Sequence, residues 1–186
     1  MKIERALGIV GWSGVGKTTL IERLLPVYAA RGLRVSTVKH CHQALALDTP
    51  GKDSWRHQQA GAVQTMLLSS AGAVIVQRTD DSDSSLEERL SALTEVDLVL
   101  VEGFRNYRFP RIEVWSPCAD RPPLATQDRQ IAAVVSDSVL DADVGCPVFT
   151  RDDIGAICAF TLQLLPQYCP PSEGINGRLT LSDLGQ

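Results

Sequence analysis

The sequence lacks the features that mark membrane, secreted and nucleic-acid-binding proteins. No apolar run approaches the ~18 residues of a membrane span, and the start of the chain does not have the pattern of a signal peptide. Basic residues are not in excess, because 18 Lys and Arg stand against 22 Asp and Glu, for a net charge of −4. The basic footprint that bulk binding to duplex nucleic acid requires is therefore missing. We expect a cytoplasmic protein with neither a membrane nor a nucleic acid as its partner.

A disulfide framework is also missing. The five cysteines are scattered, form no CxxC pair and are odd in number, which is typical of reduced thiols in the cytosol. With 44% hydrophobic and 22% charged residues, the composition is close to globular averages and excludes a disordered or fibrous class. The length of 186 residues predicts a single domain. We place this domain at residues 1–165 and expect the Pro- and Gly-rich residues 166–186 to form a C-terminal tail.

Short β-branched runs alternate with helical patterns along the domain. The runs predict strands at residues 6–10, 34–38, 63–68, 73–76, 97–101, 111–115, 131–135 and 148–149. The helical patterns cover residues 17–31, a short stretch from Asp53 or Ser54, residues 85–95 and residues 154–165. Pro26 is expected to kink or split the first helix. The alternation predicts an α/β fold with a mainly parallel sheet flanked by helices, and the two strands joined by residues 69–72 predict a β-hairpin extension, a common form of dimer contact.

The motif G-x-x-x-x-G-K-[ST] occurs at residues 11–18, Gly-Trp-Ser-Gly-Val-Gly-Lys-Thr, between a predicted strand and a predicted helix. In such a glycine-rich loop the backbone turns tightly and points N–H groups at phosphate oxygens, and the helix N-terminus adds a partial positive charge. Lys17 is expected to reach the β- and γ-phosphates, and the hydroxyl of Thr18 to bind Mg²⁺. The motif predicts a P-loop NTPase-like fold that binds a nucleotide through Gly11, Ser13, Gly14, Val15, Gly16, Lys17, Thr18 and Thr19.

A Mg²⁺ site of this kind needs a carboxylate at the end of a neighbouring strand. Asp97 and Glu102 stand at the two ends of one predicted strand, about 16 Å apart at ~3.3 Å per residue. Phosphates bind outside the carboxyl ends of parallel strands. We therefore assign Glu102 to the metal site together with Thr18, and give Asp97 a structural role.

Residues 39–57 hold all three histidines of the chain. Lys39 and His40 follow the second predicted strand, a position that suits a loop sensing the γ-phosphate or a substrate, and we assign both to nucleotide binding. Asp53, later in the segment, is a candidate catalytic residue. Two other interpretations remain open: a metal site on the histidines and Cys41, whose spacing fits no zinc pattern well, and a solvated polar loop.

Two further features concern a possible second anion site and recognition of the nucleotide base. The loop after Glu102 carries Arg105, Arg108 and Arg111, which either bind a second anion, such as a phosphorylated substrate, or stay solvated. The N-K-x-D motif of guanine recognition does not occur. Asp137, just past a predicted strand, is a possible substitute, because its carboxylate could accept hydrogen bonds from N1 and N2 of guanine.

The pattern as a whole resembles the molybdopterin-guanine dinucleotide biosynthesis adapter (MobB) family of bacterial P-loop proteins. The segments that carry the resemblance lie between residue 6 and about residue 137. They are the loop at residues 11–19, Lys39-His40 with Asp48, Pro50-Gly51-Lys52-Asp53-Ser54, Ala60-Gly61-Ala62, Val101-Glu102-Gly103-Phe104 and Ile112-Glu113. The sequence departs from the family at Cys41, where histidine is frequent, at Arg105, where lysine is frequent, and in its long tail.

The resemblance implies a GTP-binding adapter, typically dimeric, that uses Mg²⁺ and hydrolyses GTP weakly at most. Lys17, Glu102 and Asp53 are the residues expected to support hydrolysis. The implied partners are the guanylyltransferase that joins GMP to molybdopterin and the intermediates that bear molybdopterin. A small-molecule P-loop kinase and a GTPase metallochaperone are the alternative functions that the residues leave open.

Overall fold

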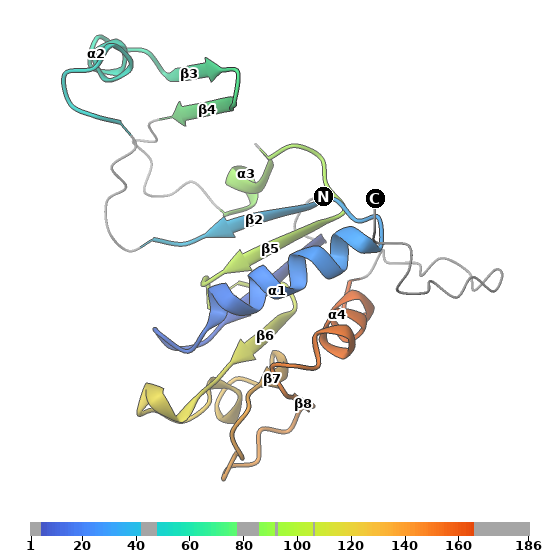
Figure 1. Cartoon of the computed structure of the whole chain (residues 1–186). Helices are drawn as coiled ribbons and strands as arrows, with labels where there is room; N and C mark the ends of the chain where they lie inside the picture. The colour runs from blue at the N-terminus through green and yellow to red at the C-terminus, as the bar shows by residue number, and fades with distance from the viewer. Residues whose placement is uncertain (1–4, 42–47, 78–85, 92, 106, 166–186) are drawn as a thin grey trace, which may run out of the picture.

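A six-stranded parallel sheet forms the centre of the protein. The computed structural model describes residues 5–41, 48–77, 86–91, 93–105 and 107–165 (Figure 1). The strand order is β2-β5-β1-β6-β7-β8, and every neighbouring pair is parallel. The strands are β1 (Ala6–Val10), β2 (Val35–Lys39), β5 (Leu98–Glu102), β6 (Arg111–Val114), β7 (Ile131–Val135) and β8 (Val148–Phe149). This arrangement confirms the predicted α/β fold.

Helices cover both faces of the sheet. On one face, α1 (Lys17–Ala30) and α4 (Ile154–Gln163) lie side by side (Figure 1), and the hydroxyls of Tyr28 and Thr161 are 2.6 Å apart between them. On the other face, α3 (Leu86–Ser91) packs Leu86 and Leu90 against alternate residues of β5. Successive side chains of a strand point to opposite faces, so the apolar residues 98–101 of β5 supply both cores.

Pro26 lies inside α1 without splitting it. The helix is one element from Lys17 to Ala30, although proline has no N–H to donate to the carbonyl of Glu22 one turn earlier. The residues of the buried face, Leu20, Ile21, Leu24 and Tyr28, continue across the proline and pack on the sheet. Packing of this face therefore outweighs the lost hydrogen bond.

The predicted hairpin is present as a second, antiparallel sheet. β3 (Gln64–Ser69) and β4 (Gly72–Gln77) pair along their whole length. The short helix α2 (Asp53–Gln59) packs on them, and Gln58 donates a hydrogen bond from Nε2 to the carbonyl of Val76 at 3.1 Å. Figure 1 shows α2 and the hairpin standing apart from the six-stranded sheet.

The connection between β6 and β7 contains two short 3-10 helices that the sequence patterns did not predict. They are η2 (Pro117–Ala119) and η3 (Leu124–Thr126). The buried carboxylate of Glu113 fixes the second of them, because it accepts hydrogen bonds from the backbone N–H groups of Leu124 (2.7 Å) and Ala125 (2.9 Å). Ser85, the first residue of the helix predicted over residues 85–95, and the tail at residues 166–186 lie outside the described residues. No helix in the described ranges is long and apolar enough to cross a membrane.

Candidate functional site

The carboxyl ends of β1, β2 and β5 open onto a cavity of about 960 Å³. Its walls are the glycine-rich loop (residues 11–18), the ends of β2 and β5, and the loop after β5. Within the described residues, this main cavity contains all of the predicted phosphate-binding positions except Val15, whose side chain is buried beneath the loop. Sequence and topology therefore agree on the location of the site.

Three glycines give the glycine-rich loop its shape. Gly11, Gly14 and Gly16 have φ of 138°, 76° and 92°, in the left-handed region that side chains disfavour. At Gly11 a Cβ would also collide with the carbonyl oxygen of Val114 on β6. The loop thus turns back onto the sheet and leads directly into the N-terminus of α1, where backbone N–H groups have no partner within the helix.

Lys17 curves back over this loop. Its Nζ donates hydrogen bonds to the carbonyl oxygens of Gly11 (3.2 Å) and Trp12 (2.7 Å). Burial lowers the pKa of Lys17 most, Glu102 opposes this, and the nearby charges of Arg105 and Lys39 lower it further. The amine is therefore a partly desolvated cation held at the mouth of the loop, as binding of a phosphate chain requires.

Thr18, Glu102 and Lys39 meet at the centre of the main cavity. The register of the sheet pairs Lys39 of β2 with Glu102 of β5, and their charged groups are 3.3 Å apart. The Thr18 hydroxyl lies 3.2 and 3.1 Å from the two carboxylate oxygens of Glu102. A hydroxyl and a carboxylate are oxygen ligands of the kind that Mg²⁺ uses beside substrate phosphates, so these residues fit the predicted metal site.

Asp97 lies at the opposite end of the same sheet. Its carboxylate accepts a hydrogen bond from the backbone N–H of Arg34 at 2.8 Å, just before β2, and its Oδ2 is 3.5 Å from the Arg34 Nε. It joins the beginnings of two parallel strands, as expected for a structural residue, and has no access to the main cavity.

Aromatic and arginine side chains line the rest of the main cavity. The ring of His40 packs on Phe104 with centroids 4.6 Å apart. Arg105 lies 4.3 Å above the ring of Trp12 and donates to the carbonyl of Gly11, while Arg121 covers the same ring at 4.5 Å. The motif accepts any residue at position 12. The packing of Trp12 between two guanidinium groups could therefore not be predicted from the sequence.

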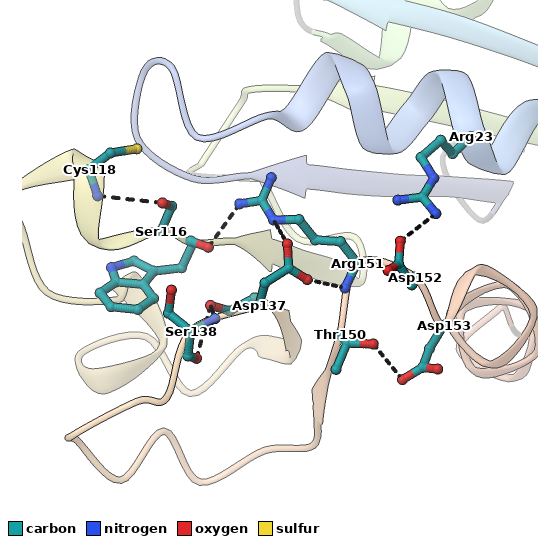
Figure 2. Close-up of polar contacts among 11 residues, drawn as sticks. Arg23, Ser116, Cys118, Asp137, Ser138, Thr150, Arg151, Asp152 and Asp153 are labelled. Atoms are coloured by element: carbon teal, nitrogen blue, oxygen red, sulfur yellow. Dashed lines mark hydrogen bonds and ion pairs between the residues drawn. The ribbon is translucent and has the colours of Figure 1, made fainter.

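Asp137 lies beside a smaller cavity of about 260 Å³ on the other side of the glycine-rich loop. Its Oδ1 accepts a hydrogen bond from the backbone N–H of Arg151 at 2.8 Å, and its Oδ2 lies 3.3 Å from the Arg151 Nε. Figure 2 shows both contacts, together with Ser138 and Ser116 around them. No sequence pattern singled out Arg151, which follows the two-residue strand β8.

Other predicted residues are not brought to either cavity. Asp53 is the first residue of α2, with a side chain 91% exposed and an Arg56 guanidinium 3.8 Å away. Arg111 begins β6 at the far end of the sheet, where it is buried and paired with Asp128 at 3.1 Å. It therefore does not contribute to a second anion site, and of the three arginines in that stretch only Arg105 lines the main cavity. Among the described residues, no three His, Cys, Asp or Glu side chains form a metal-binding group.

The parallel sheet, the helices on both faces and the glycine-rich loop between β1 and α1 define an α/β protein of the P-loop NTPase-like class. Residues 6–137 match the family model described as Molybdopterin guanine dinucleotide synthesis protein B. This chain belongs to that family, MobB, as its motifs predicted.

Relatives in several bacteria support the assignment. The chain is 35% identical over 161 residues to the molybdopterin-guanine dinucleotide biosynthesis adapter protein of Escherichia coli, which covers 84% of this chain and 91% of the relative. It is 40% identical over 139 residues to the protein of the same name in Haemophilus influenzae. That match covers 74% of this chain and 77% of the relative. A crystal structure of molybdopterin-guanine biosynthesis protein B superposes with a TM-score of 0.65 at 34% identity, over 86% of this chain and 99% of the other. The crystal structure of Bacillus subtilis MobB superposes with a TM-score of 0.68 at 27% identity, over 88% of this chain and 99% of the other.

Proposed function

We propose that this protein is a GTP-binding adapter in the biosynthesis of molybdopterin guanine dinucleotide, with weak or partner-dependent GTP hydrolysis. The observation that carries the proposal is the meeting of Lys17, Thr18 and Glu102 at the glycine-rich loop. The adapter role rests on the names of the relatives at 35–40% identity. The geometry supports nucleotide binding, and the family supports the pathway in which it is used.

The main cavity suits the phosphate end of the nucleotide. Three cationic side chains, Lys17, Lys39 and Arg105, face it, and Glu102 is its single carboxylate among the described lining residues. The loop N–H groups and Lys17 would hold the phosphate oxygens. Thr18 and Glu102 would hold Mg²⁺, which when bound neutralises charge that develops on the phosphates.

The smaller cavity suits the base. The residues proposed for the metal and the terminal phosphate lie at β5 and β2, on one side of β1, which supports a nucleoside that extends to the other side, toward β6, β7 and β8. Asp137 stands there, at the end of β7. A carboxylate is an acceptor-only group and would accept hydrogen bonds from N1 and N2 of guanine, whereas adenine offers no such pair of donors.

The residues that line the main cavity support the proposal of weak hydrolysis. Efficient transfer of a phosphoryl group needs a side chain that orients the attacking water or hydroxyl. Within the described residues no carboxylate besides Glu102 faces this cavity, and Asp53 lies outside it. His40, beside Lys39, is one of the other polar residues that line this cavity. The absence of a second carboxylate among the described lining residues also disfavours the small-molecule kinase.

The implied partners are the guanylyltransferase, the intermediates that bear molybdopterin, and a second copy of this chain. The hairpin is the surface we assign to the homodimer, because it exposes apolar side chains along both of its strands, including Met66, Leu68, Val74 and Ile75. Scattered exposed apolar residues are ordinary, but a contiguous group is typical of an interaction surface.

Calorimetry with GTP and Mg²⁺ tests the nucleotide assignment. Lys17→Ala should abolish measurable binding, while the protein keeps its unfolding temperature.

Asp137→Asn should change the choice of base, because an amide can donate to the O2 of xanthine where the carboxylate would accept from guanine. Wild-type protein should prefer GTP to xanthosine triphosphate, and the variant should reverse this order. Equal affinity of the wild type for GTP and ATP would instead favour the kinase.

A further inference from the structure

Arg151 joins four chain segments at the carboxyl end of the sheet. It follows β8, and its backbone N–H and Nε both contact the carboxylate of Asp137 after β7. One of its terminal nitrogens donates to the carbonyl of Trp115 after β6 at 3.1 Å. The other lies against the backbone of Gly16, where any Cβ would collide with it. Figure 2 shows the side chain extending from the β8 end, past Asp137, toward the loop that precedes α1.

The close approach to Gly16 connects the two cavities. Gly16 belongs to the walls of both the main and the smaller cavity, and Arg151 belongs to the smaller one together with Asp137 and Ser138. The left-handed φ of 92° at Gly16 excludes a side chain on backbone grounds, and the guanidinium fills the space that this leaves. The position of Asp137 relative to the glycine-rich loop is therefore set through one side chain.

We infer that Arg151 is a positioning residue for base selection, which fixes the carboxylate of Asp137 relative to the glycine-rich loop. The inference rests on the proposed binding of a guanine nucleotide at these two cavities. Two hydrogen bonds from the edge of a planar base require the carboxylate to be held in one plane. Asp137 is 59% exposed, against 24% for Arg151, so water alone would leave the carboxylate free to rotate. The hydrogen bond from the Arg151 backbone N–H to Oδ1 and the ion pair between Nε and Oδ2 remove that freedom, and the guanidinium is itself tied to Trp115.

Arg151 is suited to this task by its fork of donors. A guanidinium offers several donors in fixed directions, whereas the ammonium of lysine is a single point charge on a flexible stem. In this structure three of the donor nitrogens point to three different segments. Oδ1 of Asp137 accepts one hydrogen bond from the Arg151 backbone N–H, and Oδ2 is in an ion pair with Nε, which leaves acceptor capacity on both oxygens for a base.

The test compares affinities for GTP, ATP and inorganic tripolyphosphate, which has no base. Arg151→Ala should lower the ratio of GTP to ATP affinity about tenfold, the size expected for loss of one charge-assisted hydrogen bond. Arg151→Lys should not restore the ratio, because the fork is lost. Tripolyphosphate affinity should change by less than about twofold in both variants. The matched control is Asp152→Ala, which breaks the 2.9 Å ion pair to Arg23 that anchors the next residue of the same segment (Figure 2), and should keep the wild-type ratio.

Several results would overturn the inference. A GTP preference that survives in Arg151→Ala, or returns in Arg151→Lys, would show that Asp137 needs no fork. An equal loss of tripolyphosphate and GTP affinity would make Arg151 a phosphate ligand, and an equal effect of Asp152→Ala would reduce the result to loop stability. In an Asp137→Ala background, Arg151→Ala should change the ratio no further; an additional loss would contradict action through Asp137. If the wild type itself shows no preference for GTP, the base assignment fails and the inference fails with it. If the wild type prefers GTP and Arg151→Ala keeps the same ratio, only the inference fails.

Discussion

Glu102 is the residue on which the metal assignment depends. Its carboxylate lies beside the Thr18 hydroxyl and the Lys39 amine at the end of β5. Glu102→Gln removes the negative charge but keeps the size of the side chain, so we expect the gain in nucleotide affinity that Mg²⁺ provides to fall by at least about tenfold. The measurement is GTP affinity by calorimetry with and without Mg²⁺. Asp97→Asn, the matched change at the other end of β5, should leave the Mg²⁺ effect unchanged; if it is the more damaging of the two, the metal site lies elsewhere.

Asp97 has its own expected effect, on stability and its dependence on pH. The backbone N–H of Arg34 is the main cause that lowers the pKa of Asp97 in the folded protein, with the Arg34 charge adding to it. Because the folded pKa lies below the unfolded one, the ionised carboxylate stabilises the fold above the unfolded value, and this contribution is lost as pH falls through the folded pKa.

Asp97→Asn should therefore unfold at a lower temperature than the wild type at pH 7, and the difference should shrink below about pH 4. Thermal unfolding followed by circular dichroism at a series of pH values measures it. A difference that stays constant from pH 7 to pH 3 would mean that the ionised carboxylate is not the stabilising form.

The hairpin of β3 and β4 is the element to which we assign self-association. Leu68 is 76% exposed on β3, in a strand pair whose neighbouring positions are also apolar. Leu68→Glu would place a charge in a contact between two copies, and burial of an unpaired charge is strongly unfavourable. We expect the variant to be monomeric in sedimentation experiments at concentrations where the wild type is dimeric.

Val139→Glu is the control for this experiment. Val139 is 86% exposed on the connection after β7, far along the chain from the hairpin, and its change should leave the dimer intact. GTP affinity should be unchanged in Leu68→Glu, because the hairpin does not line either cavity. A wild type that is monomeric at all concentrations, or a dimer that survives Leu68→Glu, would remove this interface.

Some helices and strands could be predicted from the sequence and others could not. The apolar runs predicted β1 and β7 with their observed bounds, and the short Ser-Ser-Ala-Gly segment at residues 69–72 placed the hairpin turn, because these signals are local. The 3-10 helices after β6 follow from hydrogen bonds to the buried Glu113, which no local pattern encodes. Arg151 was missed for the same reason. Its partners come from β6, β7 and the loop after β1, and only the strand order brings these together.

At the level of the whole molecule, the strand order divides one ligand-binding end into two halves. β1 lies between the two halves, with Glu102 and Lys39 on one side of it and Asp137 and Arg151 on the other. The projecting hairpin is separate from both halves. A nucleotide could therefore be held by the sheet while the hairpin contacts a second copy, an arrangement suited to a protein that assists a partner enzyme.

Binding across both halves predicts that the nucleotide stabilises the entire domain. A ligand present at 100 times its Kd adds about 2.7 kcal/mol to the free energy of unfolding, which for a domain of this size corresponds to a rise in unfolding temperature of about 5–10 °C. We expect GTP with Mg²⁺ to produce such a rise, and ATP at the same concentration a smaller one, because adenine lacks the pair of donors through which guanine would bind Asp137 under our proposal. Lys17→Ala should abolish both shifts, and Asp137→Asn should remove the advantage of GTP while the response to tripolyphosphate remains. Differential scanning fluorimetry at a series of nucleotide concentrations provides the measurement. If the unfolding temperature of the wild type does not move with any triphosphate, the cavity at the glycine-rich loop does not bind nucleotides in the isolated protein.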